Sequence, residues 1–227
     1  PPRSEERVQG ISSLPRVWGE QPQRNLIIKE TIMPEYYYTN APTSEHEDRH
    51  FTTVFMGKTL AFDTDAGVFS KQHVDPGSEL LCKSLPELHG RVLDMGCGWG
   101  AMTIMTLSRF PSLEMTMADV NERALALAAQ NVAKNHMQAK AVLSDGFAAV
   151  EGEFDAVMTN PPIRAGKAVI YRMFEDAKAH LAPGGALYLV IRKQQGAPSA
   201  LKFLKKLYAN AEVIARDGGY WIIACEV

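Results

Sequence analysis

The stretch that decides the fold is Val92-Leu93-Asp94-Met95-Gly96-Cys97-Gly98-Trp99-Gly100. Its first part is the apolar pattern of a buried strand, and a glycine-rich turn follows, after which residues 100–109 show a helical pattern. Glycines at such a turn let the backbone pass close to a bound ligand, and the helix N-terminus then offers free amide groups. The stretch therefore predicts a strand–turn–helix unit that binds a nucleotide-like ligand.

The alternation of strand and helix patterns continues to the end of the chain. Strands are expected at 91–95, 113–119, 139–143, 154–159, 185–192, 211–216 and 220–226, and helices at about 78–85, 100–109, 121–135, 167–181 and 197–208. This order predicts an α/β fold with a doubly wound, mostly parallel seven-stranded sheet. Only Asp217-Gly218-Gly219 separates the last two strands, so they are expected to form an antiparallel hairpin. The layout resembles the Rossmann-like fold of class I methyltransferases.

The first third of the chain differs from the rest. Four prolines interrupt residues 1–32, which are expected to be a non-native or flexible extension. Residues 33–74 are expected to be an N-terminal segment in which 51–62 forms a β-hairpin that turns at Gly57-Lys58. The main domain is expected to span residues 75–227.

Composition limits the class of protein. The chain has 227 residues, and its 46% hydrophobic content is sufficient for a large α/β core. No apolar run approaches the roughly 18 residues that cross a bilayer, and the first residues lack the apolar block of a signal peptide, so a cytoplasmic protein is expected. A net charge of −2 gives no global attraction to nucleic acid. Any RNA binding would therefore need a local basic patch or a larger assembly.

Neither cysteine nor histidine spacing indicates a metal site. Cys82, Cys97 and Cys225 form no CxxC pair and are expected to be reduced and structural. Residues 46–50 match HExxH, but the intervening positions are Asp and Arg in a polar segment rather than part of an apolar helix. No metal is therefore expected.

The glycine turn is compatible with two cofactors, a dinucleotide or S-adenosylmethionine. Gly96, Gly98 and Ala101 also fit the GxGxx(G/A) pattern of dinucleotide sites. Asp94 favours S-adenosylmethionine, because a carboxylate there would repel a pyrophosphate but attract the ammonium group of the methionine part. Asp119, with Val120 after it, ends the next strand, where an acidic side chain can accept hydrogen bonds from ribose hydroxyls.

Two further strand ends carry polar residues. After the third strand, Asp145-Gly146-Phe147 offers a carboxylate for the adenine amino group and a ring for the adenine face, although core packing is an equally good interpretation of Phe147. After the fourth strand comes Asn160-Pro161-Pro162-Ile163, whose prolines carry no N–H. The turn therefore offers mainly acceptors, which suit the NH2 group of a substrate. Ligands of α/β sheets bind at these carboxyl ends.

These motifs resemble the bacterial small-subunit rRNA guanine-N2 methyltransferases, in their short single-domain form. Besides the glycine turn, the resemblance covers residues 160–167, 66–70 and 195–199. It implies methyl transfer from S-adenosylmethionine to guanine N2, with ribosomal RNA or a ribosomal subunit as partner. The resemblance assigns Asn160 and Pro161 to the target amine. The residues expected to contact the cofactor are Asp94, Gly96, Cys97, Gly98, Asp119, Val120, Asp145, Gly146, Phe147 and Asn160.

The substrate side rests on weaker patterns. Ile163 or Phe69 is expected to pack on the base, and the expected phosphate contacts are Lys71, Arg164, Lys167, Arg192 and Lys193. Adenine N6 and a protein glutamine amide remain alternative acceptors, although an aromatic residue usually follows the prolines in those enzymes. A non-catalytic role in ribosome assembly, with S-adenosylmethionine still bound, is a third alternative.

Overall fold

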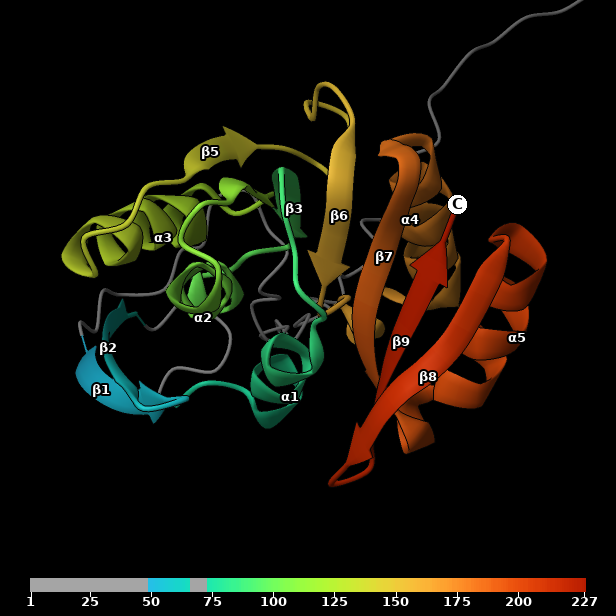
Figure 1. The fold of residues 1–227 in the computed structure, drawn as a ribbon, viewed down its shortest axis with the longest axis horizontal. Helices are drawn as coiled ribbons and strands as arrows, with labels where there is room; N and C mark the ends of the chain where they lie inside the picture. Colours follow the sequence, from blue (N-terminus) through green and yellow to red (C-terminus); the bar gives the residue numbers. More distant parts are fainter. Residues whose placement is uncertain (1–48, 66–72) are drawn as a thin grey trace, which may run out of the picture. The chain divides into compact units, whose positions relative to one another are not determined.

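The structure is a computed structural model that describes residues 49–65 and 73–227. These residues form a seven-stranded sheet with helices on both faces and a separate two-stranded hairpin (Figure 1). The elements in chain order are β1 (Arg49–Phe55), β2 (Lys58–Thr64), α1 (Pro76–Ser84), β3 (Arg91–Met95), α2 (Ala101–Arg109), β4 (Glu114–Asp119), α3 (Glu122–Lys134), β5 (Lys140–Leu143), β6 (Phe154–Thr159), the 3-10 helix η1 (Ile163–Ala165), α4 (Lys167–Ala179), β7 (Leu181–Arg192), the 3-10 helix η2 (Lys193–Gln195), α5 (Ala197–Leu207), β8 (Asn210–Asp217) and β9 (Tyr220–Glu226).

The order of strands in the large sheet is β5-β4-β3-β6-β7-β9-β8. Strands β3 to β7 pair in parallel, and β9 runs antiparallel to both β7 and β8. The expected doubly wound sheet with an antiparallel C-terminal hairpin is confirmed. In chain order, β4 and β5 are added to the sheet on one side of β3, and β6 then pairs with the other side of β3. The gap between the carboxyl ends of β3 and β6 is therefore a topological switch point, where such sheets bind ligands.

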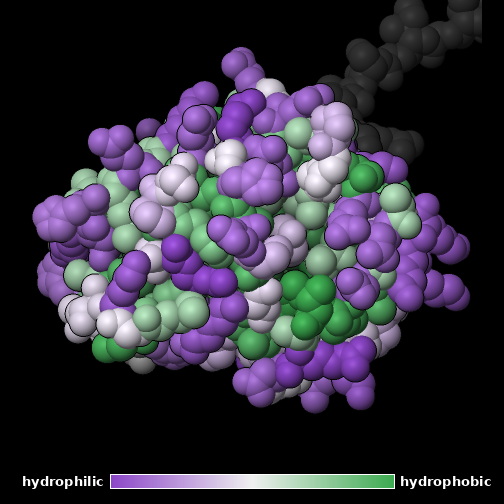
Figure 2. Space-filling model, viewed as in Figure 1, coloured by the Kyte–Doolittle hydropathy of each residue, from purple (hydrophilic) through white to green (hydrophobic). Residues whose placement is uncertain are grey.

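Two apolar layers sandwich the sheet. One cluster joins the sheet to α1, α2, α3 and the hairpin and contains Phe62, Leu81 and Met105. The other joins the opposite face to α4 and α5 and contains Phe174 and Leu204. Hydrophilic side chains cover most of the surface in the view of Figure 2, and an apolar area remains near the C-terminal strands. No helix in the described ranges is long and apolar enough to cross a membrane.

Several expected boundaries were wrong by a few residues. The hairpin turns at Met56-Gly57 rather than Gly57-Lys58, because both residues adopt positive φ (48° and 82°), as a two-residue turn requires. The helix expected to reach residue 181 ends at Ala179. Strand β7 begins at Leu181 rather than 185, and its pairing with β6 shifts register before Ala186. That irregularity accommodates Pro183, which has no N–H for the ladder.

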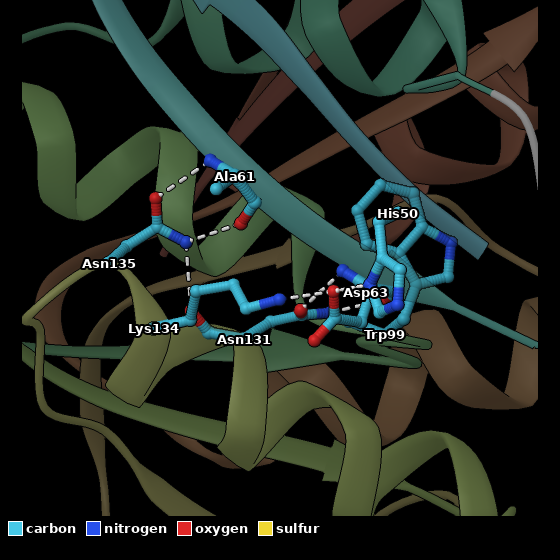
Figure 3. Close-up of polar contacts among 7 residues, drawn as sticks. All are labelled: His50, Ala61, Asp63, Trp99, Asn131, Lys134 and Asn135. Atoms are coloured by element: carbon cyan, nitrogen blue, oxygen red, sulfur yellow. Dashed lines mark hydrogen bonds and ion pairs between the residues drawn. The ribbon is translucent and has the colours of Figure 1, made fainter. Parts of the chain in front are cut away.

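The hairpin is attached to α3 through side-chain amides that pair with the backbone of β2 (Figure 3). Asn131 accepts from Asp63 N at 2.7 Å and donates to the carbonyls of Asp63 and Trp99, both at 2.9 Å. Asn135, one helical turn later, accepts from Ala61 N at 3.0 Å and donates to Ala61 O at 2.7 Å. The two asparagines thus replace a third strand along the otherwise open edge of β2.

Replacement of Asn131 by alanine is expected to destabilise the fold by about 2–3 kcal/mol, because it leaves buried peptide groups without their partner. Asn131 is fully buried, whereas Asn135 is partly exposed and water can replace its side chain. Asn135→Ala is therefore the matched control, with an expected cost near 1 kcal/mol. Urea denaturation of both variants measures the difference. Equal and small costs would show that the amides do not hold the hairpin.

Candidate functional site

The glycine turn lies at the switch point and is tied to the end of β4. The amides of Gly96 and Cys97 donate to the Ala118 carbonyl at 2.8 and 3.1 Å, and Gly98 N donates to Asp119 Oδ2 at 2.8 Å. Gly96 and Gly98 have φ values of 74° and 54°, and a Cβ built on either would meet no atom of the described part of the chain within 4 Å. The turn therefore passes beside open space at the start of α2, as a ligand-binding turn should.

Asp94 lies beneath this turn with one carboxylate oxygen unused. Its Oδ2 accepts from Thr103 N at 3.1 Å and Thr103 Oγ1 at 2.7 Å, whereas its Oδ1 is buried and receives no hydrogen bond from the residues that the structure describes. Burial raises the pKa of this carboxyl to about 7, against the lowering effect of Thr103, and the nearby Asp119 carboxylate also raises it. A buried acceptor without a donor is costly. An ammonium group beside Oδ1 would supply both the donor and the opposite charge.

Asp119 is in a position to bind a diol. Its Oδ2 accepts from Gly98 N and its Oδ1 from Asn121 N at 2.9 Å, so both oxygens are held in place. Burial raises the pKa of Asp119, and the backbone amides of Asn121, Gly98 and Val120 oppose that rise. Each carboxylate oxygen has two acceptor positions, so each can still accept one hydroxyl. Val120, next in the chain, is half-buried at the same edge.

The residues expected at the adenine end lie in the turn after β5 and differ in their exposure to solvent. Asp145 is exposed, and Gly146 is half-buried with φ 55°, so the backbone of this turn is accessible. Phe147 is only 6% exposed and packs in the apolar layer under α4, with its ring 4.8 Å from that of His180. The structure thus favours the core-packing interpretation of Phe147, because a ring buried in that layer is not free to cover an adenine.

Asn160 directly follows β6 and is oriented by the start of α1. Its Nδ2 donates to Ser78 Oγ at 2.9 Å and to Asp75 Oδ2 at 3.2 Å. Since an ionised carboxylate only accepts, Asp75 determines which end of the amide faces α1. Within residues 49–65 and 73–227, Oδ1 of Asn160 receives no hydrogen bond. The side chain therefore presents a free acceptor.

The proline turn presents a second acceptor. The Pro162 carbonyl is used by Ala165 N at 2.9 Å, whereas no donor in the described ranges binds the Pro161 carbonyl. Thr159 Oγ1 donates to Met95 O at 2.8 Å and so ties the ends of β6 and β3 together. The turn at residues 160–162, called the acceptor turn below, therefore lies beside the glycine turn.

Asp75 and Ser78 are functional candidates that sequence reasoning missed. The pattern around Pro76 indicated a helix start, and Asp75 is indeed the N-cap, with its Oδ2 accepting from Ser78 N at 2.9 Å. The sequence contained no signal that the same carboxylate also binds Asn160, since the two residues are 85 positions apart.

The expected substrate residues are spread along the same edge of the sheet. Ile163 is half-buried in η1 and packs on the α4 layer. Arg164, Lys167, Arg192 and Lys193 are exposed. Lys167 Nζ lies 5.0 Å from the Tyr171 ring centroid. Phe69 and Lys71 lie outside the described residues.

Other candidate sites do not compete with this edge. A cavity of about 510 Å³ is lined by Arg91, Glu114, Lys140 and Phe154, the first residues of β3 to β6, so it lies at the opposite edge of the sheet. In the described part of the chain no group of three or more His, Cys, Asp or Glu residues could hold a metal ion. Residues 46–48 of the HExxH match lie outside that part. Cys82, Cys97 and Cys225 are free and buried.

The strand order, the antiparallel β9 and the acidic residues at the strand ends define an α/β protein with the class I methyltransferase fold. The chain belongs to the methyltransferase small domain family, whose model matches residues 59–224.

Relatives of two kinds support this membership. The chain is 40% identical over 196 residues to the uncharacterized protein YbxB of Bacillus subtilis, covering 84% of this chain and 98% of that protein. It is 39% identical over 162 residues to ribosomal RNA small subunit methyltransferase C of Shewanella loihica, covering 70% of this chain but 46% of that protein. The chain therefore spans about half the length of the rRNA methyltransferases that it matches.

A solved structure shows the same fold. The T. thermophilus 16S rRNA N2 G1207 methyltransferase, determined in complex with AdoMet and guanosine, superimposes with a TM-score of 0.71 and 27% sequence identity. The match covers 82% of this chain and 52% of that one. A ribosomal protein L11 methylase from Lactobacillus delbrueckii has a TM-score of 0.58 at 18% identity and is similar in fold alone.

Proposed function

We propose that this protein transfers a methyl group from S-adenosylmethionine to N2 of a guanine in small-subunit ribosomal RNA. The observation that carries the proposal is the orientation of Asn160, whose Nδ2 is held by Asp75 and Ser78, which leaves Oδ1 on the other side of the amide as an acceptor. Guanine N2 is an NH2 group and needs acceptors. The neighbours named as guanine-N2 or small-subunit rRNA methyltransferases support the choice of substrate.

The residues around the glycine turn fit S-adenosylmethionine. Asp94 Oδ1 would accept from the ammonium group of the methionine part, and the space beside Gly96 and Gly98 would take its chain. Asp119 would bind the ribose hydroxyls, and Asp145 with the Gly146 backbone would meet the adenine end. When bound, S-adenosylmethionine supplies a methyl group activated by the positive sulfonium.

The acceptor turn would prepare the amine for attack. Asn160 Oδ1 and the Pro161 carbonyl would each hold one N2 hydrogen, which directs the nitrogen lone pair toward the methyl group. These oxygens also stabilise the positive charge that develops on nitrogen as the N–C bond forms and the S–C bond breaks. The amine then loses one proton to water, because amide oxygens are not bases at neutral pH.

Access to this turn requires an unpaired base. A guanine in a duplex keeps N2 within the stack, so the target must be flipped out or already single-stranded. Ile163 follows the prolines and could contact the base, and the exposed cations at this edge, among them Arg164 and Lys193, could contact phosphates.

The proposal is tested by methyl transfer from labelled S-adenosylmethionine to ribosomal RNA. The RNA is taken from cells that lack this protein and is supplied both naked and as ribosomal subunits. We expect label in N2-methylguanosine after nucleoside analysis. Label only in N6-methyladenosine or in a protein glutamine would identify one of the alternative acceptors and refute guanine N2. Binding of S-adenosylmethionine without transfer to either substrate would instead indicate a non-catalytic role in ribosome assembly.

A further inference from the structure

The β8–β9 hairpin brings an aromatic residue to the edge of the candidate site. Tyr220 is the first residue of β9 and pairs with Arg192, the last residue of β7. The amide of Lys193 donates to the Gly219 carbonyl at 2.8 Å, which fixes the hairpin turn to the end of β7. Tyr220 and Arg192 therefore lie at the carboxyl edge of the parallel strands, in the same layer as α1.

The Tyr220 ring reaches the residues that orient Asn160. A Cβ built on Gly77 would lie 2.6 Å from Cδ1 and Cε1 of Tyr220 and 3.0 Å from Asp75 Oδ2. The ring therefore packs against the backbone of the first turn of α1, beside the Asp75 carboxylate. Since the Asp75 carboxylate accepts from Asn160 Nδ2 at 3.2 Å, the Tyr220 ring lies close to the acceptor turn.

Arg192 is held on this ring but remains exposed. Its Cζ lies 4.5 Å from the Tyr220 centroid, and its Nη2 donates to the Tyr220 hydroxyl. The hydrogen bond to Tyr220 raises the pKa of Arg192, and the negative charge of Asp75 contributes to the rise. A guanidinium has five N–H donors in a planar fork, so most of them remain available. Two carboxylates belong to the surroundings of this pair: Asp75 acts electrostatically on Arg192, and Asp217 is the cross-strand partner of Tyr220 on β8.

On the basis of the proposed function, we infer that Arg192, positioned by Tyr220, binds a backbone phosphate of the RNA segment that carries the target nucleotide. The fork of a guanidinium matches two phosphate oxygens, and phosphate contacts set the position of a nucleic acid on a protein. A side chain already held on an aromatic ring loses less conformational entropy on binding than a free one. The contact would set how far the base reaches into the acceptor turn.

The same hairpin provides a matched control. Arg216 lies over Trp221 with its Cζ 4.5 Å from the ring centroid, and the two form a cross-strand pair between β8 and β9. Successive residues of a strand point to opposite faces. Trp221 accordingly packs in the α4–α5 layer, on the other face from Tyr220. Arg216→Gln therefore removes one positive charge and one cation–π contact from the face opposite α1.

The test is binding of a fluorescent single-stranded RNA oligonucleotide that contains one guanine, measured over a range of salt concentrations with S-adenosylhomocysteine present. We expect Arg192→Gln to raise the Kd about 10-fold and to reduce the salt slope by about one, because one charged phosphate contact is lost. Arg216→Gln should change the Kd less than about twofold, because its charge faces away. Arg192→Lys should fall between wild type and Arg192→Gln, since it keeps the charge without the fork.

Tyr220→Phe separates positioning from charge. This variant keeps the ring and every charge but removes the hydroxyl that receives Arg192, so we expect the Kd to rise several-fold with an unchanged salt slope. An effect of Tyr220→Phe therefore reports the loss of the hydroxyl, because loss of ring packing would need a larger change of side chain, such as Tyr220→Ala. No effect of Tyr220→Phe would overturn the positioning role.

The outcomes distinguish this inference from the proposed function. If wild-type protein forms N2-methylguanosine and Arg192→Gln does so with the same KM, the phosphate contact is wrong and the proposed function stands. If Arg192→Gln alone weakens RNA binding but no N2-methylguanosine forms, the contact stands and the acceptor is wrong. Equal losses for the Arg192 and Arg216 variants, or no binding by wild type, would overturn the inference.

Discussion

Asn160→Ala is expected to lower kcat for methyl transfer by at least about 100-fold, the loss typical when one preorganised polar group is removed from a charged transition state. The change removes Oδ1, the acceptor that is left over when Asp75 and Ser78 hold Nδ2. Binding of the methyl donor should weaken far less, because Asp94 and Asp119 remain. Single-turnover transfer and calorimetric titration of S-adenosylmethionine measure the two effects separately.

Two further variants test whether orientation of the amide, rather than its presence, is what matters. Asn160→Asp keeps the shape but places a second carboxylate oxygen against Asp75 Oδ2, so the acceptor should lose its orientation and kcat should fall as in the alanine variant. Ser78→Ala removes one of the two partners of Nδ2 and leaves Asp75, so its loss should stay below about 10-fold. Full activity of the Asn160→Asp protein would contradict the acceptor role.

The affinity for S-adenosylmethionine is expected to fall as pH decreases below about 7, where the buried Asp94 carboxyl takes up a proton. In the proposed site the ionised form of Asp94 would attract the ammonium group of S-adenosylmethionine, whereas the neutral form would have no charge with which to do so. The Kd should therefore rise by up to about tenfold per pH unit below the pKa of Asp94. Titration calorimetry between pH 5 and 8 measures this, and it should also show proton uptake by the buffer on binding near pH 6.5.

Asp94 should also make the stability of the ligand-free protein depend on pH in the opposite sense. The folded-state pKa of Asp94, about 7, lies above the ordinary aspartate pKa of 3.8, so between these values the folded state binds more protons than the unfolded state. The contribution of Asp94 to the free energy of unfolding therefore decreases as pH rises through this window, by at most about 1.4 kcal/mol per unit.

Asp94→Asn is the control for both effects, because the amide can still accept from Thr103 but does not titrate. The affinity of the Asp94→Asn protein for S-adenosylmethionine should be weak and nearly independent of pH between 5 and 8. Its free energy of unfolding should lack the contribution that falls as pH rises. A wild-type Kd that stays constant over this range would show that Asp94 does not bind the ammonium group.

Local pattern predicted most of the fold. Strands β3, β6 and β9 begin and end where the apolar runs and turn residues placed them. The boundary that was least accurate, the start of β7, depends on how β6 and β7 pair around Pro183, which is a tertiary event. The positions of Asp94, Asp119 and Asn160 at one edge were also predictable, because the carboxyl ends of parallel strands meet there.

The sequence by itself determined the parallel sheet, its antiparallel final strand and the order of polar residues along the carboxyl edge, because these follow from periodicity, turn residues and the geometry of parallel strands. Only the tertiary structure decided which atoms face the site. Asp75 turns the Asn160 amide, Asn131 pairs with β2, Phe147 enters the core, and Tyr220 holds Arg192. These contacts join segments far apart in the chain, and their partners depend on packing that no local pattern records.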